Sequence, residues 1–467
     1  MAAVLSATGR NFDTHVPLLI IGAGAAGLCA ALAAKEAGVE PLVIERDAVP
    51  TGSTALSAGL IPAAGTRFQR AKGIADSPEL FAADIQRKAK GEADAAIVST
   101  VAQGAGPAVE WLSDRYSLPF DVVDNFNYPG HSAMRMHGLP TRSGAELIDR
   151  LRSAAETNDI SVVSECIAET LLTGQGDAIR GVETIRGDGA RESIGCDALI
   201  LACNGYGGNS ALVRRFIPEM ADALYFGHPG NRGDAVIWGE ALGAQFAHLG
   251  GYQGHGSVAT PHNILITWAT IMEGGYQVNR EGRRFCDESQ GYSEQAAEVL
   301  HQPGGIAWSV FDARIASIAR QFEDFRNAEQ AGALVTVDSM QALADALHVP
   351  AAAFMAEWQE AEALKAKSGR DRFGRQFAPA QQLTPPFHAI KVTGALFHTQ
   401  GGLAIDAQTR VKRMDGTPFP NLFAAGGAAA GVSGSTAAGY LSGNGLLTAT
   451  TLGRLAGQAA AARVGHR

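Results

Sequence analysis

Apolar and polar positions follow two patterns along the chain, one typical of buried strands and one typical of helices. The run VPLLII (16–21) is continuously apolar, which predicts a strand buried on both faces. Residues 25–38 show helical spacing and end in a glycine, and EPLVIER (40–46) predicts the next strand. Two later segments, 160–172 and 196–209, are also predicted strands, and the second ends in a Gly-rich turn.

The other periodic segments favour helices, and the mixture of residue types changes in the second half of the chain. Residues 66 to about 120 have helical apolar spacing, and Ser143 is placed to cap another helix. Between about 245 and 385 the chain mixes helical, polar and charged stretches. We therefore expect an α/β fold, in which a Rossmann-like domain (1–245 and 386–467) is interrupted by an α+β domain (246–385).

Composition narrows the class of protein. The 467 residues are 46% hydrophobic and 18% charged, which is enough apolar material for a large core. The net charge of −9 argues against nucleic acid or an anionic membrane as partner, and no apolar run is long enough to span a bilayer. The N-terminus does not resemble a secretory signal, and the five cysteines form no CxxC pair. We expect a cytoplasmic protein with reduced thiols and no metal site.

Gly22, Gly24 and Gly27 form a GxGxxG motif between the first strand and helix, and Glu45 ends the second strand. Glycines allow the backbone to approach a pyrophosphate at the helix start, and an acidic residue about 20 positions later binds a ribose hydroxyl. A tight turn without a ligand is the alternative, but strand, turn, helix, strand and acid occur in register. The chain has no second GxGxxG after a strand, so we expect one dinucleotide, FAD, and no NAD(P)H domain.

The segment TGSTALSAGLIPAAG (51–65) consists of small and apolar residues. It is too flexible for a good helix and too rich in Gly and Ser for a good strand. Such a loop brings backbone N–H groups and hydroxyls close to a flat ring or a phosphate. We therefore expect this loop to lie against the flavin.

Several motifs together resemble the flavoproteins of the fumarate reductase and 3-ketosteroid dehydrogenase group. They are IIGAGAAGLCAALAA, TGSTALSAGLIPAAG, ALILACNGYGGN, NRGDAVIWGEALGA, GGYQVNREGRRFCDES, FHTQGGLAID and NLFAAGG…YLSGNGLL. They cover almost the whole chain in the family's order. The resemblance implies an FAD domain interrupted by a mobile cap domain.

The resemblance also implies the residues that contact FAD. Asn444 and Gly443 would lie at the pyrimidine edge, where a helix start stabilises negative charge on the reduced flavin. Ser53 or Thr54 stands where some members attach FAD to a histidine, so we expect non-covalent FAD. The full set is Gly22, Gly24, Ala25, Ala26, Gly27, Glu45, Arg46, Ser53, Thr54, Ser57, Gly59, Leu60, Ile167, Ala168, Ala202, Gly205, Asp234, Gly426, Gly443, Asn444 and Leu446.

Two tyrosines distinguish the branches of this group. Fumarate-type members use an arginine acid and a second, carboxylate-binding arginine, and the matching places here are Tyr292 and Tyr440. A dicarboxylate requires bidentate cationic partners, which tyrosine cannot replace. Gly427, where the fumarate branch has a glutamate, and Asn204, where a glycine is usual, are further departures.

In 3-ketosteroid dehydrogenases the two matching places hold tyrosines. One takes a proton from the carbon next to the ketone, the other hydrogen-bonds the ketone oxygen with help from a backbone N–H, and a hydride leaves for flavin N5. Because phenol is a poor base at its ordinary pKa of about 10, Tyr292 would need activation, and Tyr128 is the candidate helper by resemblance.

Four further residues are candidates for contact with the substrate. His255 and His398 match places of substrate-binding histidines in fumarate-type members, and they suggest a small polar or acidic group on the substrate. Gly445 follows Asn444 at the expected pyrimidine edge. Arg135 could pair with a carboxylate, although an exposed structural arginine is the simpler interpretation.

These observations predict an FAD-dependent ketone α,β-dehydrogenase. The chain is shorter than typical steroid members, so the substrate is expected to be a smaller cyclic ketone, such as an oxo-cyclohexane carboxylate, with an external electron acceptor. One alternative is an enoate reductase of the same fold, running the reverse reaction. Another is a flavin-binding subunit without chemistry of its own.

Overall fold

The computed structural model describes residues 3–124 and 127–465. Backbone contacts divide the chain into two compact units, each described by itself below. The first comprises the residues up to Ile217, Gly227–Tyr252 and the residues from His398 onward, and the second comprises Pro218–Phe226 and Gln253–Phe397. The predicted inserted domain has the limits 246 and 385, whereas the long stretch of the second unit runs from Gln253 to Phe397. The domain assignment stays a prediction.

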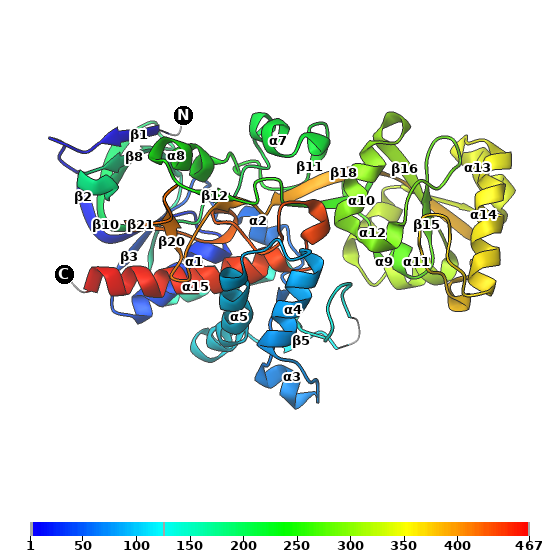
Figure 1. Cartoon of the computed structure of the whole chain (residues 1–467), viewed down its shortest axis with the longest axis horizontal. Helices are drawn as coiled ribbons and strands as arrows, with labels where there is room; N and C mark the ends of the chain where they lie inside the picture. Colours follow the sequence, from blue (N-terminus) through cyan, green and yellow to red (C-terminus); the bar gives the residue numbers. More distant parts are fainter. Residues whose placement is uncertain (1–2, 125–126, 466–467) are drawn as a thin grey trace. The chain divides into compact units, whose positions relative to one another are not determined.

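A mainly parallel sheet organises the first unit (Figure 1). Strands β7, β3, β2 and β10 are parallel neighbours, and β21 pairs with β10 in parallel. The register sets Ile20 opposite Val43 and Ile200. The strands of this sheet are β1 (Ala3–Ser6), β2 (Thr14–Ile21), β3 (Pro41–Ile44), β7 (Ser161–Val163), β8 (Cys166–Thr173), β9 (Ile179–Arg186), β10 (Arg191–Leu201), β20 (Arg410–Lys412) and β21 (Pro418–Ala424).

Continuous apolar runs form the inner strands because both faces of the sheet are covered. Leu18, Leu19 and Ile20 are fully buried, as the sequence pattern predicts for a parallel sheet. The helices of this unit are α1 (Ala25–Glu36), α2 (Gly52–Ala55), α3 (Arg67–Ala71), α4 (Pro78–Lys88), α5 (Ala95–Tyr116), α6 (Gly144–Thr157), α7 (Ser210–Phe216), α8 (Asp234–Leu242) and α15 (Asn444–Gly465).

Helices α1 and α15, from opposite ends of the chain, pack side by side (Figure 1). A side chain on Gly453 or Gly457 of α15 would overlap backbone atoms of Ala26 or Ala30 in α1. Both contacts require glycine because the two backbones meet directly. This close packing places the start of α1 and the body of α15 on the same core.

Two predictions at the level of elements need correction. The segment 51–65, expected to be a loop, contains one helical turn, α2, and the short strand β4 (Ile61–Pro62), which pairs with β6 (Met136–Gly138). The single strand predicted at 160–172 is two strands, β7 and β8, separated by a turn in which Glu165 has φ +53°.

The second unit is built on a mainly antiparallel sheet covered by helices. Its strands are β11 (Leu224–Tyr225), β13 (Tyr252–Ala259), β14 (Ile264–Leu265), β15 (Tyr276–Val278), β16 (Ile306–Asp312), β17 (Leu334–Val337) and β18 (Phe387–Thr399). Its helices are α9 (Ala269–Met272), α10 (Tyr292–Leu300), α11 (Ala313–Ala319), α12 (Glu323–Gln330), α13 (Met340–Leu347) and α14 (Ala351–Ala366). The first unit also contains two short antiparallel strand pairs. In one, β5 (Asp121–Val122) pairs with β6, and in the other, β12 (Phe246–Ala247) pairs with β19 (Gly402–Leu403).

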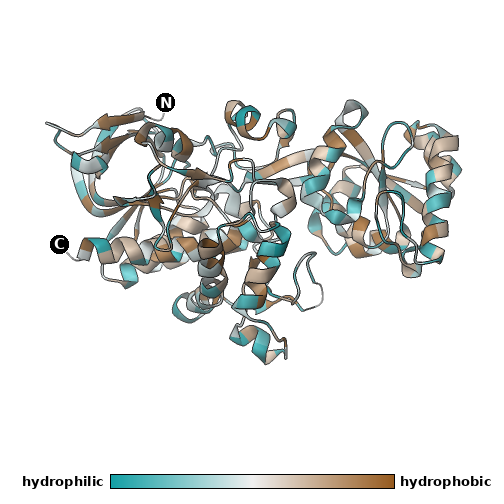
Figure 2. Cartoon of the chain, viewed as in Figure 1, coloured by the Kyte–Doolittle hydropathy of each residue, from teal (hydrophilic) through white to brown (hydrophobic). Residues whose placement is uncertain are grey.

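Each unit has its own hydrophobic core. Figure 2 shows apolar residues along the strands of both sheets, while the outward faces of several helices are hydrophilic. Within 3–124 and 127–465, no helix combines the length and apolar character needed to cross a bilayer.

Candidate functional site

The Gly-rich turn after β2 has the geometry that a pyrophosphate requires. Gly22 has φ +105°, and a side chain on Gly27 would overlap the carbonyl oxygen of Gly22. Gly24 precedes α1 without providing a side-chain cap. The positive end of the helix dipole is therefore presented at this turn.

The carboxylate of Glu45 lies beside the same turn. Its Oε2 accepts a hydrogen bond from the N–H of Ala23 at 2.8 Å, and its Oε1 accepts from the N–H of Asp47 at 3.1 Å. The backbone of Glu45 also binds the N–H of Cys166 at 2.8 Å. That bond brings the start of β8, with the half-exposed Ile167 and the buried Ala168, next to the expected ribose site.

Other predicted cofactor residues gather around this turn in the first unit. Ala202 N–H donates to Ile21, and a side chain on Gly22 would overlap Ala202. A side chain on Gly205 would overlap the hydroxyl of Thr399, and one on Gly426 would meet Ala26 of α1. The structure thus brings these glycines close to α1, and their contact with FAD stays a prediction.

Arg46 and Asp234 form an ion pair. The Nη2 of Arg46 lies 2.9 Å from Oδ2 of Asp234, the first residue of α8. Burial raises the pKa of Asp234, although the charges of Arg46 and Arg232 oppose the shift. The expected phosphate contacts of this pair remain a prediction.

Two asparagines hold the hydroxyl of Ser53 in α2. The Nδ2 groups of Asn204 and Asn231 donate to Ser53 Oγ at 3.1 and 2.9 Å. Because Oδ1 of Asn204 accepts from the N–H of Gly205, its amide cannot be reversed without losing that bond. Ser53 therefore accepts from its protein partners and can donate its own proton to a ligand.

The side chains of Thr54 and Ser57, close to Ser53 in the sequence, form hydrogen bonds within the protein. Thr54 Oγ1 accepts from the N–H of Ala25 at 3.0 Å, which joins α2 to the start of α1. Ser57 Oγ donates to the carbonyl of Thr54 and accepts from the N–H of Gly59, which closes a turn. Thr54 and Ser57 thus shape the segment, whereas Ser53 has the geometry of a ligand donor.

Tyr440 lies at the start of α15. Its hydroxyl is hydrogen-bonded by the backbone N–H groups of Gly443 and Gly445, and its ring centroid lies 5.5 Å from that of His398. A side chain on Gly445 would come within 3.0 Å of Cε1 and Nε2 of that histidine. Tyr440, His398 and Gly445 are therefore brought together in the first unit.

Burial keeps both of these side chains neutral at pH 7. It raises the pKa of Tyr440 above its ordinary value, and the two N–H groups oppose the shift. Burial lowers the pKa of His398 to about 4, with an opposing backbone hydrogen bond to Thr399. This cluster therefore offers hydrogen-bond donors without a positive charge.

Tyr128 packs on the same side of the first unit. It lies against Leu60, Val123 and Met136, and a side chain on Gly443 would contact Met136 and overlap Pro62. Burial raises the pKa of Tyr128. Tyr128 thus shares Met136 with the start of α15, and its expected role as a helper stays a prediction.

The expectation that Arg135 is an exposed arginine is wrong. Its side chain is fully buried and forms ion pairs with Asp76 at 2.9 Å and Asp84 at 2.6 Å, both also fully buried. Apolar residues that flank it in the sequence, in AMRMHG, gave no sign of these distant carboxylates. The arrangement is structural, because these two carboxylates neutralise the guanidinium, and we do not propose Arg135 as a substrate ligand.

The second unit carries a tyrosine–histidine pair of its own. The rings of Tyr292 and His255 are stacked, with centroids 4.9 Å apart and an interplanar angle of 18°, and Trp268 meets the His255 ring edge-on. The N–H of Ser257 donates to Nδ1 of His255 at 3.2 Å, so the ring proton must be on Nε2. Burial lowers the pKa of His255 to about 3, so this ring is neutral.

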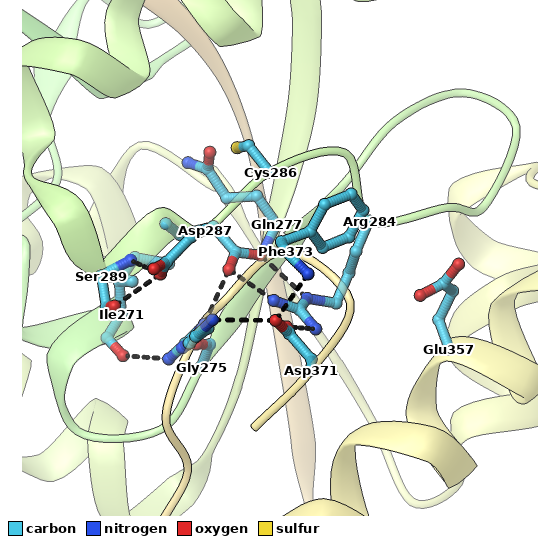
Figure 3. Close-up of polar contacts among 12 residues, drawn as sticks. Ile271, Gly275, Gln277, Arg284, Cys286, Asp287, Ser289, Glu357, Asp371 and Phe373 are labelled. Carbon is cyan, nitrogen blue, oxygen red and sulfur yellow. Dashed lines mark hydrogen bonds and ion pairs between the residues drawn. The ribbon is translucent and has the colours of Figure 1, made fainter. Parts of the chain in front are cut away.

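A buried charge cluster anchors the segment that leads to Tyr292. Arg284 binds Glu288 through two hydrogen bonds of 3.0 and 2.7 Å. It also pairs with Asp371 at 2.7 Å (Figure 3). Arg375 donates to the same Glu288 at 2.9 Å. Because Glu288 lies four residues before Tyr292, these bonds fix the start of α10.

One unpartnered atom fits a flavin at the start of α15. The Oδ1 of Asn444 is buried and has no hydrogen-bond partner among the described residues. The pyrimidine edge of an isoalloxazine carries an N–H group that such an acceptor can bind. The residues present therefore fit FAD. The placement of Asn444 and Gly443 at this edge, and of the α1 turn at the pyrophosphate, stays a prediction.

Sequence reasoning did not find three residues of these clusters: Asn231, Gln400 and Ser433. Asn231 lies 178 residues from Ser53, and Ser433 lies 33 residues from Gln400, so no local pattern links them. Gln400 follows His398 by two positions. In an extended segment this spacing places both side chains on the same face, so it could have indicated their contact.

Comparisons with known proteins agree with this geometry. The FAD binding domain family matches residues 18–446. A probable fumarate reductase, Ifc3, of Shewanella frigidimarina (strain NCIMB 400) is 29% identical over 455 residues, which cover 97% of this chain and 76% of the relative.

Two solved structures show a similar fold. The open conformation of a flavocytochrome c3 fumarate reductase has a TM-score of 0.83 and 28% identity, covering 97% of this chain and 79% of that one. A 3-ketosteroid-Δ4-(5α)-dehydrogenase from Rhodococcus jostii RHA1 has a TM-score of 0.78 and 22% identity, covering 99% and 100%. The chain therefore belongs to the FAD binding domain family and is an FAD-dependent oxidoreductase acting on CH–CH groups.

Proposed function

We propose that the protein introduces a carbon–carbon double bond next to the carbonyl of a small cyclic ketone. The observation that carries this proposal is the neutral donor cluster of Tyr440 and His398 at the start of α15. A ketone oxygen, which gains negative charge as the neighbouring carbon loses its proton, is stabilised by such preorganised donors. A dicarboxylate would instead require a cation, and tyrosine stands at both places where the fumarate branch has arginine.

The roles follow from the chemistry of each side chain. Tyr440 accepts two backbone N–H groups and stays protonated, so it is the donor to the carbonyl oxygen. Tyr292, stacked on the neutral His255, is the proposed base for the proton on the adjacent carbon. When bound, FAD supplies the acceptor for the hydride from the next carbon. The electrons then pass to an external acceptor, which returns the enzyme to its oxidised form.

The reverse direction is the second candidate, because a fumarate reductase is 29% identical to this chain. An enoate reductase would use the same donors to polarise an unsaturated carbonyl compound. The residues alone do not set the direction, which depends on the potential of the electron partner.

Anaerobic mixing of the holoenzyme with substrates separates the two candidates. We expect cyclohexanone or 4-oxocyclohexanecarboxylate to bleach the oxidised flavin, whereas fumarate and acrylate should fail to reoxidise the reduced enzyme. Bleaching should slow by about 100-fold or more in Tyr292→Phe and Tyr440→Phe. The control is Tyr116→Phe, whose hydroxyl binds the carbonyl of Leu32 near the far end of α1.

Unchanged bleaching in both active-site variants would refute the mechanism, and reoxidation by unsaturated acids alone would establish the reductase. We also propose that FAD is bound non-covalently, because Ser53 and Thr54 lie where other members carry a histidine. Acid precipitation of the holoenzyme should then leave a colourless pellet and yellow supernatant.

A further inference from the structure

His398 is linked to the start of α15 by a chain of buried hydrogen bonds. Nδ1 of His398 lies 3.0 Å from Nε2 of Gln400, and Oε1 of Gln400 lies 2.7 Å from Oγ of Ser433. Ser433 Oγ in turn lies 2.9 Å from Nδ2 of Asn444. Gln400, Ser433 and Asn444 are 4%, 1% and 0% exposed, so water does not compete for these bonds.

The direction of donation along this chain determines which ring nitrogen is protonated. The amide nitrogen of Asn444 can only donate, so Ser433 accepts it and donates its own proton to Oε1 of Gln400. The other end of the Gln400 amide is then an N–H donor facing Nδ1 of His398. Nδ1 must accept, and in a neutral ring the proton is on Nε2.

The orientation of the Asn444 amide supports this direction. With its nitrogen toward Ser433, its oxygen is left as the buried acceptor that fits the flavin edge. The carbonyl of Thr399 lies 3.4 Å from Nδ1 of His398 and would favour the opposite tautomer, but it is a longer contact than the 3.0 Å to Gln400. In the second unit, the backbone N–H of Ser257 imposes the same tautomer on His255.

We propose that Gln400, oriented by Ser433, is a positioning residue that holds His398 as a neutral Nε2–H donor to the substrate oxygen. Nε2 lies on the side of Gly445, and the ring adjoins Tyr440. His398 and Tyr440 then offer two donors to an oxygen that can only accept, which selects a carbonyl over a hydroxyl. The proposal rests on the proposed function for the identity of that oxygen, but the tautomer does not depend on it.

The test uses holoenzyme labelled with ¹⁵N-histidine, with the His398 signals assigned by their loss in His398→Gln. In the wild type we expect a protonated Nε2 and an unprotonated Nδ1, without titration between about pH 6 and 8. In Gln400→Glu the carboxylate accepts a proton from Nδ1, so His398 should begin to titrate in that range. The KM for the ketone should rise by about ten-fold and become pH-dependent, with a smaller change in kcat.

Gln103→Glu is the matched control, because it adds the same charge on the exposed face of α5 and should change none of these values. If Gln400→Glu does not fold, Ser433→Ala should give a mixture of both His398 tautomers. A wild-type signal with the proton on Nδ1, or a tautomer unchanged in both variants, would overturn the proposal. Failure of every ketone to react would refute the proposed function and leave the tautomer result intact.

Discussion

At the scale of single residues, Ser53 shows how hydrogen bonds within the protein orient a hydroxyl that is proposed to contact FAD. Two asparagine amides donate to its hydroxyl, so its own proton can serve as a donor to FAD. Asn204 reaches Ser53 from a left-handed backbone conformation with φ +63°, which asparagine and glycine tolerate best.

Replacing Asn204 by glycine therefore tests the amide without straining the backbone. We expect Asn204→Gly to fold normally and to bind FAD about five- to ten-fold more weakly, because one neutral hydrogen bond to Ser53 is lost. Fluorescence titration of apoprotein with FAD measures the effect. Asn263→Gly, an exposed asparagine with φ +57°, is the control; equal affinity in both variants would show that Asn204 is not needed.

Residue-level prediction succeeded where a local pattern carried the information. The GxGxxG spacing and Glu45 identified the turn at α1, because strand, helix and acid follow one another in the sequence. Arg135 was misjudged because its partners Asp76 and Asp84 lie 59 and 51 residues away. Polar networks of this kind join residues that only the folded chain brings together.

At the scale of elements, the glycines of α15 control how closely it packs on α1. A side chain on Gly457 would overlap the carbonyl oxygen of Ala30, a backbone atom that cannot rotate away. The helices would have to separate, and the start of α1 would move with them.

We expect Gly457→Ala to lower the free energy of unfolding by about 1–3 kcal/mol, as overpacking does in other cores. FAD affinity should fall as well, because α1 begins at the turn that is proposed to bind the pyrophosphate. Urea unfolding and FAD titration measure the two effects. Gly465→Ala, at the last position of the same helix with no atoms within 4 Å of the added carbon, should change neither.

Element prediction worked for long periodic segments and failed for short ones. The buried strands β2, β3 and β10 and helix α1 follow from continuous apolar or helical spacing. The small-residue segment after β3 formed α2 and β4 because Thr54 binds α1 and Ile61 pairs with His137. Such tertiary contacts outweigh the weak local propensity of Gly and Ser.

At the scale of the whole molecule, the buried charges of the second unit make stability depend on pH. Burial would raise the pKa of Glu288, but the charges of Arg284 and Arg375 outweigh it and lower the pKa to about 2 from its ordinary value of 4.5. A carboxyl with a lowered folded-state pKa stabilises the fold above its unfolded pKa, and this contribution is lost as the pH falls.

We expect stability to fall between about pH 4.5 and 2, with Glu288 contributing on the order of 3 kcal/mol. Glu288→Gln should remove this part of the pH dependence. It should also lower the free energy of unfolding by about 3–5 kcal/mol at pH 7, because two buried arginines lose a negatively charged partner. Urea unfolding followed by tryptophan fluorescence at several pH values measures both. Glu329→Gln, in the more exposed pair with Arg320, should cost about 1 kcal/mol or less; a similar cost in both variants would contradict the account.

The change in composition after residue 245 indicates an inserted domain, and its limits stay a prediction. The pairing of β18 with β16 and β17 could not be predicted, because the apolar run of β18 suits either sheet. The charge cluster was also missed, since Arg375 reaches Glu288 from a position 87 residues further along the chain.

The packing of α15 on α1 has a consequence for synthesis. The first unit draws strands and helices from both ends of the chain, whereas most of the second unit is one continuous stretch. During translation the stretch 253–397 leaves the ribosome before β21 and α15 exist, so it can fold first. The first unit can complete its core only when α15 has emerged, and until then the face of α1 that α15 covers stays exposed.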